Sequence, residues 1–109
     1  MMDNNLLAYH KMPINLDRLQ SLGALLQQCE EEGVKVKEAF SYMNGFLLVF
    51  EDIPGDAILH DGSYARDWCW WETIGMPWDG EDVSTHDPVT LGRMLGALKR
   101  GENWEKYDE

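Results

Sequence analysis

Apolar residues recur at helical spacing over residues 15–32. The stripe consists of Leu16, Leu19, Leu22, Leu25, Leu26 and Cys29. Asn15 is a favourable N-cap, and Gly33 is a favourable residue for a helix C-terminus. The pattern predicts an amphipathic helix over 15–32 whose leucines face the core. Residues 1–13 show no such pattern and end at Pro13, so we expect a loosely held N-terminal arm.

A second helix is predicted near the other end of the chain, over residues 88–100. Asp87 and Pro88 form a typical cap and first-turn pair. The expected buried stripe is Val89, Leu91, Met94, Leu95 and Leu98. Gly92 and Gly96 stand four positions apart, a spacing that lets a neighbouring backbone approach closely, and we expect them to pack tightly on the sheet.

Apolar runs on both sides of Asn44-Gly45 predict a β-hairpin within residues 34–53. A two-residue type I′ turn at Asn44-Gly45 would pair Met43 with Phe46 and set the register of the strands. One face would then carry Val36, Phe40, Tyr42, Leu47, Val49 and Ile53. We expect the helices to cover this face. The other face would carry Ala39, Ser41, Met43, Phe46, Leu48 and Phe50. It is too apolar to be wholly exposed, so the tryptophan-rich segment or a second subunit should cover part of it.

Further strands are predicted after this hairpin. Residues 56–60 read as a short strand, and Asp61-Gly62 is a second hairpin signal. The next strand falls within residues 63–74. Residues 75–85 contain several turn-forming residues, so we expect them to form an acidic loop.

These elements place the chain in the α+β class, as a single two-layer domain over residues 1–109. An antiparallel sheet of three to four strands would be packed by the N-terminal and C-terminal helices in the order αββββα. A chain of this length buries about two thirds of its unfolded surface around one core. Residues 101–109 are expected to form a polar tail.

Four of the five tryptophans lie between Trp68 and Trp78. Each can bury on the order of 200 Å², so the segment either builds the core or presents an aromatic surface. In an extended segment, Trp70 and Trp71 point to opposite faces. We predict that Trp71 and Trp78 are the partly exposed indoles.

Charge is the compositional feature that most narrows the function. The chain has 9 basic and 20 acidic residues, a net charge of −11. Between Glu38 and Gly92, Arg66 is the only Lys or Arg. The carboxylates of this stretch are Glu38, Glu51, Asp52, Asp56, Asp61, Asp67, Glu72, Asp79, Glu81, Asp82 and Asp87. A field of one sign attracts cationic partners and repels polyanions, which disfavours direct nucleic-acid binding and favours a basic protein partner.

Side chains that could hold a metal or support catalysis are few and unspecifically spaced. The candidates are His60, Asp61, Asp67, Cys69, His86 and Asp87. Structural zinc needs four well-spaced Cys or His ligands and a catalytic site about three, and here a turn explains Asp61 and a helix cap explains Asp87. The common phosphate-loop, zinc-protease and nucleophile motifs are missing. We therefore expect no metal, no cofactor and no enzymatic activity.

Targeting signals are not evident in the sequence. The N-terminus has neither the basic region nor the apolar core of an export signal, and no apolar run is long enough to span a membrane. We expect a cytoplasmic protein that does not bind membranes. Cys29 and Cys69 are expected to stay reduced and to behave as small apolar side chains.

In composition alone, the chain resembles the short acidic inhibitors that phages and mobile elements encode, such as anti-CRISPR and anti-restriction proteins. It equally resembles the immunity proteins that neutralise basic nuclease toxins. The resemblance implies occlusion of a basic, nucleic-acid-handling surface of a partner protein, with nucleic-acid mimicry as one form. Carboxylates would speed association, and tryptophans would anchor the complex. The residues predicted to bind the partner are Asp67, Trp71, Glu72, Trp78, Asp79, Glu81 and Asp82.

Two other functional classes stay open, a structural or oligomerisation domain and a small-molecule-binding domain. In the first, the apolar sheet face at Phe46, Leu48 and Phe50 would be the alternative interface, and it could support a homodimer. A steep loss of partner binding with rising salt would distinguish the inhibitor from both.

Overall fold

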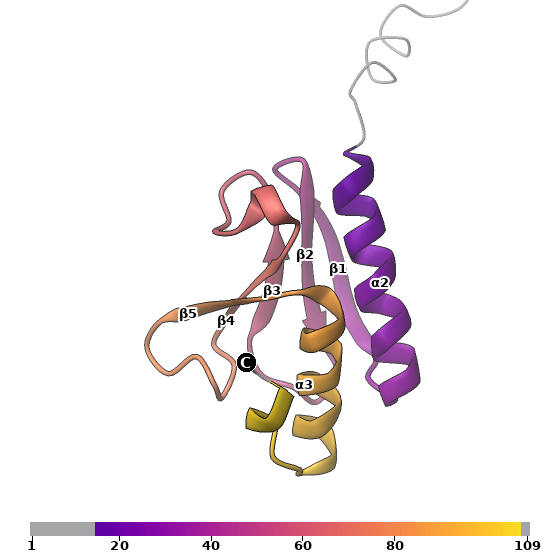
Figure 1. Cartoon of the computed structure of the whole chain (residues 1–109), viewed down its shortest axis with the longest axis vertical. Coiled ribbons are helices and arrows are strands. Elements are labelled where there is room, and N and C mark those ends of the chain that lie inside the picture. Colours follow the sequence, from indigo (N-terminus) through magenta and orange to yellow (C-terminus); the bar gives the residue numbers. More distant parts are fainter. Residues whose placement is uncertain (1–14, 108–109) are drawn as a thin grey trace, which may run out of the picture.

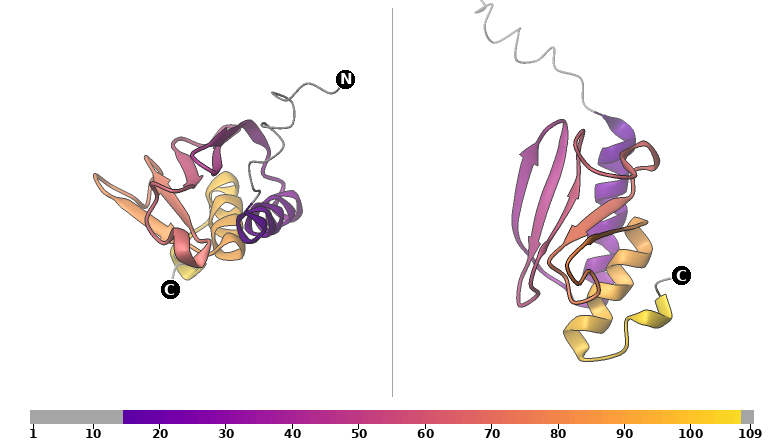
Figure 2. Two further views of the ribbon diagram at one scale, coloured as in Figure 1. Left: turned by 90° about the horizontal axis from the view of Figure 1, so that it is seen from above. Right: turned by 90° about the vertical axis from the view of Figure 1, so that its left-hand side faces the viewer.

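A five-stranded antiparallel sheet carries two helices on one face in the computed structural model of the protein, which describes residues 15–107 (Figure 1). The elements are α2 (Leu16–Glu32), β1 (Val36–Tyr42), β2 (Gly45–Phe50), β3 (Asp56–Leu59), the 3-10 turn η1 (Arg66–Trp68), β4 (Trp71–Ile74), β5 (Val83–His86), α3 (Pro88–Arg100) and the 3-10 turn η2 (Glu105–Tyr107). Each strand pairs with the next in the chain, and both helices lie on the same side of the sheet (Figure 2). The predicted α+β domain, with a sheet between an N-terminal and a C-terminal helix, is confirmed.

The number of strands was predicted wrongly, because the sheet has five and the order is αβββββα. Residues 75–85 were expected to form a loop, but they contain most of β5. In the observed register Val83 pairs with Ile74 and His86 pairs with Trp71. β5 is only four residues long, too short for its alternation to stand out, and its pairing satisfies backbone groups of β4 that would otherwise lie at an open edge.

The predicted hairpin at Asp61-Gly62 is also wrong. β3 and β4 do pair antiparallel, with Ile58 opposite Glu72, but residues 60–70 connect them and include η1. Asp61 and Gly62 do occupy the centre of a tight turn, which the Ser63 N–H closes by donating to the His60 carbonyl at 3.0 Å. This turn begins a longer connection and does not join the two strands directly.

Both helices begin and end where their capping residues predict. The Asn15 Oδ1 accepts a hydrogen bond from the Arg18 backbone N–H at 3.1 Å, and Gly33 adopts a left-handed φ of 73° after the last turn. At the second helix, the Asp87 Oδ1 accepts from the Thr90 N–H at 3.0 Å. Local hydrogen-bonding needs at the helix ends explain these boundaries.

Helix α2 is rotated away from the orientation that its leucines predict. Its buried residues are Arg18, Ser21, Leu25 and Cys29. The predicted stripe residues Leu16, Leu19 and Leu26 are exposed. Polar contacts account for this rotation, because Ser21 Oγ donates to the Cys69 carbonyl at 2.6 Å and Arg18 forms an ion pair with Asp61 at 2.7 Å. Leu16, Leu19 and Leu26 therefore lie along an exposed flank of the helix, whereas Leu25 and Cys29 of the predicted stripe enter the core.

The two helices approach each other closely at the glycines of α3. A Cβ atom built at Gly92 would collide with Gln28, and one at Gly96 would collide with Glu32. The prediction of a close approach is correct, but the neighbouring element is α2 rather than the sheet. Nothing larger than glycine fits at these positions without moving α2.

The turn between β1 and β2 lies one residue earlier than predicted. Met43 and Asn44 occupy its centre with φ values of 45° and 59°, and Tyr42 pairs with Gly45. Gly45 is the first residue of β2. A Cβ atom at this position would overlap the Leu59 carbonyl oxygen of β3. Close packing between neighbouring strands, rather than turn conformation, requires this glycine.

The helices cover the hairpin face opposite to the predicted one. Leu48 and Phe50 are only 2% and 1% exposed, whereas Phe40 is 50% exposed on the outer face. A bulge between Val36 and Glu38 shifts the register, so that Val36 shares the covered face with Phe50. The alternative interface at Phe46, Leu48 and Phe50 is therefore wrong, because these side chains contribute to the core.

One hydrophobic core joins the sheet to both helices. It comprises Leu25, Cys29, Val34, Leu48, Phe50, Ile53, Ala57, Leu59, Trp71, Met76, Leu91 and Leu95. Of the predicted tail 101–109, the described part ends with η2, and the predicted arm 1–13 lies outside the described residues. Neither helix between residues 15 and 107 is long and apolar enough to cross a membrane.

Candidate functional site

Trp71, which was predicted to be partly exposed at a partner-binding site, lies in the core with 0% exposure. Its indole N–H donates to Ser21 Oγ at 3.0 Å. Trp71 therefore connects β4 to α2, and its prediction as an interface residue is wrong. The error arises because Trp71 occupies the inward-facing position of the Trp70-Trp71 pair.

Glu72 and Asp79 were also predicted to bind a partner, but both are buried and accept internal hydrogen bonds. The Glu72 Oε1 accepts from the Tyr64 backbone N–H at 3.0 Å. The Asp79 carboxylate accepts from the Met76 N–H at 3.0 Å and from the Thr73 hydroxyl at 2.9 Å. These carboxylates stabilise loops, and they are not free to bind a partner's cations.

Trp78 is half-buried and makes contacts within the protein. Its indole N–H donates to Thr73 Oγ1 at 3.0 Å, and its ring centroid lies 6.0 Å from that of Trp104 in the C-terminal segment. Trp78 thus helps to hold that segment against the β4–β5 hairpin.

The exposed members of the predicted site are Asp67, Glu81 and Asp82. Asp67 lies in η1, which precedes β4, whereas Glu81 and Asp82 follow β4. The two groups consequently lie at opposite ends of that strand (Figure 1). The residues predicted from the sequence do not form one surface.

The exposed aromatic residues lie in the connection between β3 and β4, residues 60–70. Trp68 is 75% exposed, Tyr64 69% and Trp70 42%. We refer to Tyr64, Asp67, Trp68 and Trp70 as the aromatic cluster. Sequence reasoning missed the exposure of Trp68 and Trp70, although the alternation that buries Trp71 indicates that Trp70 points outward.

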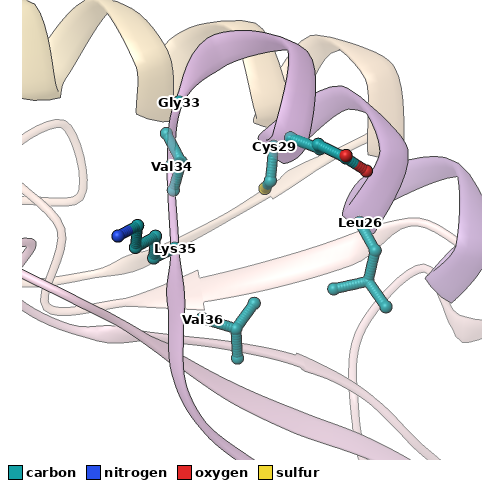
Figure 3. A pocket seen from close by; sticks show the side chains of 7 residues that line it. Leu26, Cys29, Gly33, Val34, Lys35 and Val36 are labelled. Carbon is teal, nitrogen blue, oxygen red and sulfur yellow. The ribbon is translucent and has the colours of Figure 1, made fainter.

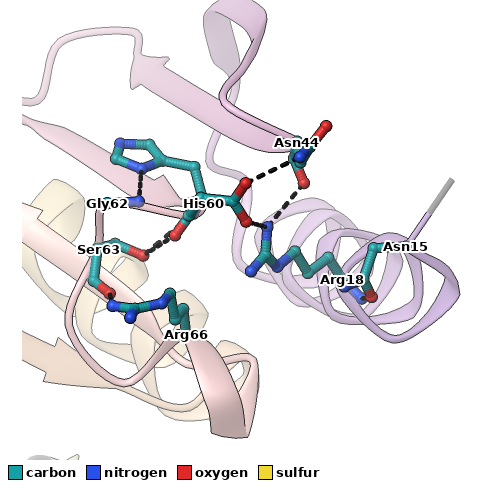
Figure 4. Close-up of polar contacts among 8 residues, drawn as sticks. Asn15, Arg18, Asn44, His60, Gly62, Ser63 and Arg66 are labelled. Atoms are coloured by element: carbon teal, nitrogen blue, oxygen red, sulfur yellow. Dashed lines mark hydrogen bonds and ion pairs between the residues drawn. The ribbon is translucent and has the colours of Figure 1, made fainter. Parts of the chain in front are cut away.

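An ion pair attaches this connection to the rest of the domain (Figure 4). Arg18 Nη1 donates to Asp61 Oδ1 at 2.7 Å and to the Asn44 carbonyl at 2.9 Å. The Asn44 side-chain amide donates to the other Asp61 oxygen at 2.8 Å. These hydrogen bonds, with that of Arg18 first, hold the pKa of Asp61 below its usual range. One arginine thereby joins α2, the β1–β2 turn and the connection.

The connection is also ordered by hydrogen bonds of its own (Figure 4). The Gly62 N–H donates to His60 Nδ1 at 3.0 Å, and Ser63 Oγ donates to the His60 carbonyl at 2.8 Å. Further along, Arg66 Nη1 donates to the Ser63 carbonyl at 3.1 Å. The backbone that carries the aromatic cluster is therefore preorganised, which reduces the entropy lost on binding.

An apolar hollow lies between the end of α2 and the start of β1 (Figure 3). Its volume is about 320 Å³, and Leu26, Cys29, Val34 and Val36 provide its apolar lining. Burial raises the pKa of the Cys29 thiol to about 12. The thiol is therefore protonated at neutral pH, so it is a poor nucleophile and a poor metal ligand.

The candidate metal ligands are not gathered into one site. Within residues 15–107, no group of three or more His, Cys, Asp or Glu side chains is arranged to hold a metal ion. Asp61 pairs with Arg18, and Asp87 caps α3. The expectation that the protein needs no metal stays a prediction.

Ser84 and His86 form a polar chain that could be mistaken for a catalytic pair. Ser84 Oγ lies 2.7 Å from His86 Nε2, but it donates its proton to Asp79. A hydroxyl has one proton to donate, so Ser84 accepts from His86, which must carry its proton on Nε2. His86 in this state cannot act as a base toward Ser84, and the arrangement does not activate a nucleophile.

The chain was compared with protein-family models, curated proteins and solved structures. None of them matches it.

Proposed function

We propose that this protein is a small acidic inhibitor that binds a basic protein and covers the surface with which that partner handles nucleic acid. The observation that carries the proposal is the aromatic cluster, in which Tyr64, Trp68 and Trp70 are exposed on a preorganised connection. The acidic anti-defence proteins of phages and mobile elements and the immunity proteins of nuclease toxins share this mechanism.

Exposed tryptophan and tyrosine side chains are suited to anchoring a protein complex. They bury a large area, lose little conformational entropy and dominate the binding energy of many interfaces. Solvation of such rings in the free protein is unfavourable, so three of them within seven positions indicate an interaction surface. The Arg18–Asp61 ion pair helps to fix the connection that presents them.

The negative charge of the chain supports the choice of a basic partner. With a net charge of −11, the protein repels nucleic acid and attracts cationic surfaces over long distances. Asp67 contributes a carboxylate next to the anchors, and it is exposed. Because Glu72 and Asp79 accept internal hydrogen bonds, the remaining exposed carboxylates must provide the steering. Their main effect should be on the association rate.

The test is capture of partners on the immobilised chain at low salt, followed by rate measurements with the captured protein. Trp68→Ala should increase the dissociation rate about tenfold or more, as for a typical hot-spot residue. Asp67→Lys should chiefly slow association. Leu16→Ala is the matched control, because Leu16 is 65% exposed on α2 and should leave both rates unchanged.

The proposal also requires competition with nucleic acid. Excess DNA or RNA should displace the protein from its partner, and rising salt should weaken the complex. A captured partner with no basic surface, or binding that tolerates both Trp68→Ala and high salt, would favour an oligomerisation or small-molecule-binding domain.

A further inference from the structure

Within residues 15–107, no helix or strand packs on the face of the sheet opposite the helices (Figure 2). The connection of residues 60–70 reaches one part of it, where Ile58 and Glu72 are buried. We call this face of the sheet the outer sheet face. Its paired, outward-facing positions are Glu38, Phe40, Tyr42, Leu47, Val49, Asp56, Ile58, Glu72, Ile74, Val83 and Thr85. They follow from the two-residue alternation of strands whose other side chains enter the core. Most of these side chains are apolar, although they face away from the core.

Apolar side chains of the outer sheet face remain accessible on three different strands. Phe40 of β1, Ile74 of β4 and Val83 of β5 are all exposed. Leu47 and Val49 of β2 are half-buried between them. The exposed residues are thus distributed across the sheet and do not form a single isolated contact. An extended apolar face of this kind is typical of an interaction surface.

The charged groups of this face are all negative at the paired positions. Glu38 and Asp56 are carboxylates, and no Lys or Arg occupies a paired outward position. Glu72 is also a carboxylate of this face, but it is buried and accepts from the Tyr64 N–H, so it is not available to a partner. Lys37 lies at the bulge of β1, outside the pairing. A partner that complements the face must therefore be apolar and positively charged.

Asp56 is a carboxylate of this face whose hydrogen bonding is not fully satisfied within residues 15–107. Its Oδ1 atom is buried and has no hydrogen-bond partner. Burial raises the pKa of this carboxyl group above its ordinary value. A cation placed beside the carboxylate would offset the cost of desolvation.

The outer sheet face is continuous with the connection that bears the aromatic cluster. The Tyr42 ring lies 5.2 Å from the His60 ring, edge to face. At the next strands, the Tyr64 backbone N–H donates to Glu72 Oε1. A partner anchored on Tyr64 could therefore extend across the sheet.

A second copy of this chain is a poor occupant for the face. Two copies would bring the carboxylates of one face against those of the other, and each chain carries a net charge of −11. Like charges facing each other across an interface disfavour such a complex. The remaining choice is a different, positively charged protein.

We propose that the outer sheet face docks a partner surface whose apolar side chains are flanked by lysine or arginine. The inference rests on the proposed function and deepens it, because it names the chemistry of the partner and a second contact area. In the complex, Phe40 and Ile74 would contact the partner's apolar side chains, and Asp56 would pair with one of its cations.

The experiment uses the full ¹⁵N-labelled chain and a synthetic peptide of alternating Leu and Lys as the probe. A Ser/Lys peptide of equal length is the control for charge alone. The Leu/Lys peptide should bind about tenfold more tightly, and its amide shifts should cover β1 to β5 at outward positions. Equal affinity for both peptides, no binding at all, or shifts confined to α2, α3 or the β4–β5 loop would overturn the inference.

Variants then locate the contact. Phe40→Ser should weaken the Leu/Lys peptide about tenfold, whereas Leu16→Ser on the helical side should not. Asp56→Asn should weaken the same peptide while raising the melting temperature of the free protein, since it removes a desolvated charge. Unchanged binding by Phe40→Ser, in a variant with the fold of the parent, would contradict the inference. The inference would also be contradicted if the parent protein sedimented as a dimer and Phe40→Ser sedimented as a monomer. The outer sheet face would then bind a second copy of the chain.

A third variant separates this inference from the proposed function. If Phe40→Ser weakens the peptide and Trp68→Ala does not, the outer sheet face stands and the aromatic cluster fails as an anchor. If Trp68→Ala alone weakens it, the cluster stands and the outer sheet face fails.

Discussion

Arg18 and Asp61 stand 43 positions apart in the chain, and their side chains meet at 2.7 Å. Arg18 is buried, and besides Asp61 it contacts the Asn44 carbonyl at 2.9 Å. The pair lies where α2, the β1–β2 turn and the connection of residues 60–70 converge. It therefore joins α2 and the β1–β2 turn to the connection that carries the exposed aromatic residues.

The first prediction concerns the acid stability that this pair provides. The pKa of Asp61 is lowered in the folded state, so its contribution is present above the unfolded pKa of about 3.9. This contribution is lost as the pH falls through the lower folded value. Asp61→Asn should lower the unfolding free energy at pH 7. Because the variant has no carboxylate to protonate at this position, it should also lose less unfolding free energy than the parent when the pH falls below about 4. Asp82→Asn, which removes the same charge from an exposed position, is the control for denaturation measured across this pH range.

The second prediction tests which hairpin face is buried. Phe50→Asp should prevent stable folding, because it removes a buried ring worth roughly 3–5 kcal/mol and buries a charge in a domain of about 5–15 kcal/mol total stability. Phe40→Asp should remain folded, since Phe40 is half exposed on an edge strand. Thermal unfolding followed by circular dichroism compares the two. Loss of folding in the Phe40 variant, with the Phe50 variant intact, would reverse our assignment of the faces.

The third prediction concerns the contact between the two helices. Gly92→Ala should destabilise the protein by about 1–3 kcal/mol, because the methyl group would overlap Gln28. Gly23→Ala is a matched control in α2, where nothing lies within 4 Å of the new methyl group. It should stabilise the helix by up to about 1 kcal/mol. Urea denaturation of both variants would show opposite signs, and equal signs would contradict the close approach.

The fourth prediction is selective reactivity of the two thiols. Both are free in the structure, with Cys29 buried and Cys69 half-buried. With a pKa of about 12, about one Cys29 thiol in ten thousand is ionised at pH 8. A disulfide reagent should modify Cys69 in the native protein at least tenfold faster than Cys29. Equal rates in native protein, measured by mass spectrometry, would indicate that α2 opens readily.

The fifth prediction is that the fold does not depend on a metal. Extensive dialysis against a chelator should leave the melting temperature unchanged, because a structural metal would contribute its binding free energy to folding. A decrease of about ten degrees that zinc reverses would imply a site involving His60, Cys69 or His86.

Local rules in the sequence determined where the helices begin and end. Asn15 and Asp87 cap helices because a short polar side chain can reach the free N–H groups of the first turn, whatever the rest of the chain does. The hairpin between β1 and β2 follows from a similar local signal, since Asn44 readily accepts a positive φ. The α+β class was predictable because these signals need only neighbouring residues.

Only the tertiary structure determines which face of the β1–β2 hairpin is buried. The β1–β2 hairpin has two apolar faces, so alternation alone could not show that Phe50, rather than Phe40, enters the core. The position of Gly45 depends on its contact with β3, and no rule for isolated turns includes that contact.

The candidate site was less predictable than the fold, because its geometry depends on long-range polar contacts. Arg18 and Ser21 turn inward on α2 and bind Asp61 and Cys69. These partners lie far along the chain, so the leucine spacing of the helix could not reveal the contacts. Ser21 also accepts from the indole of the buried Trp71, whereas Trp68, three residues earlier, is 75% exposed. Composition determined the negative charge and the abundance of tryptophan. Only packing decided which indoles form the core and which meet solvent.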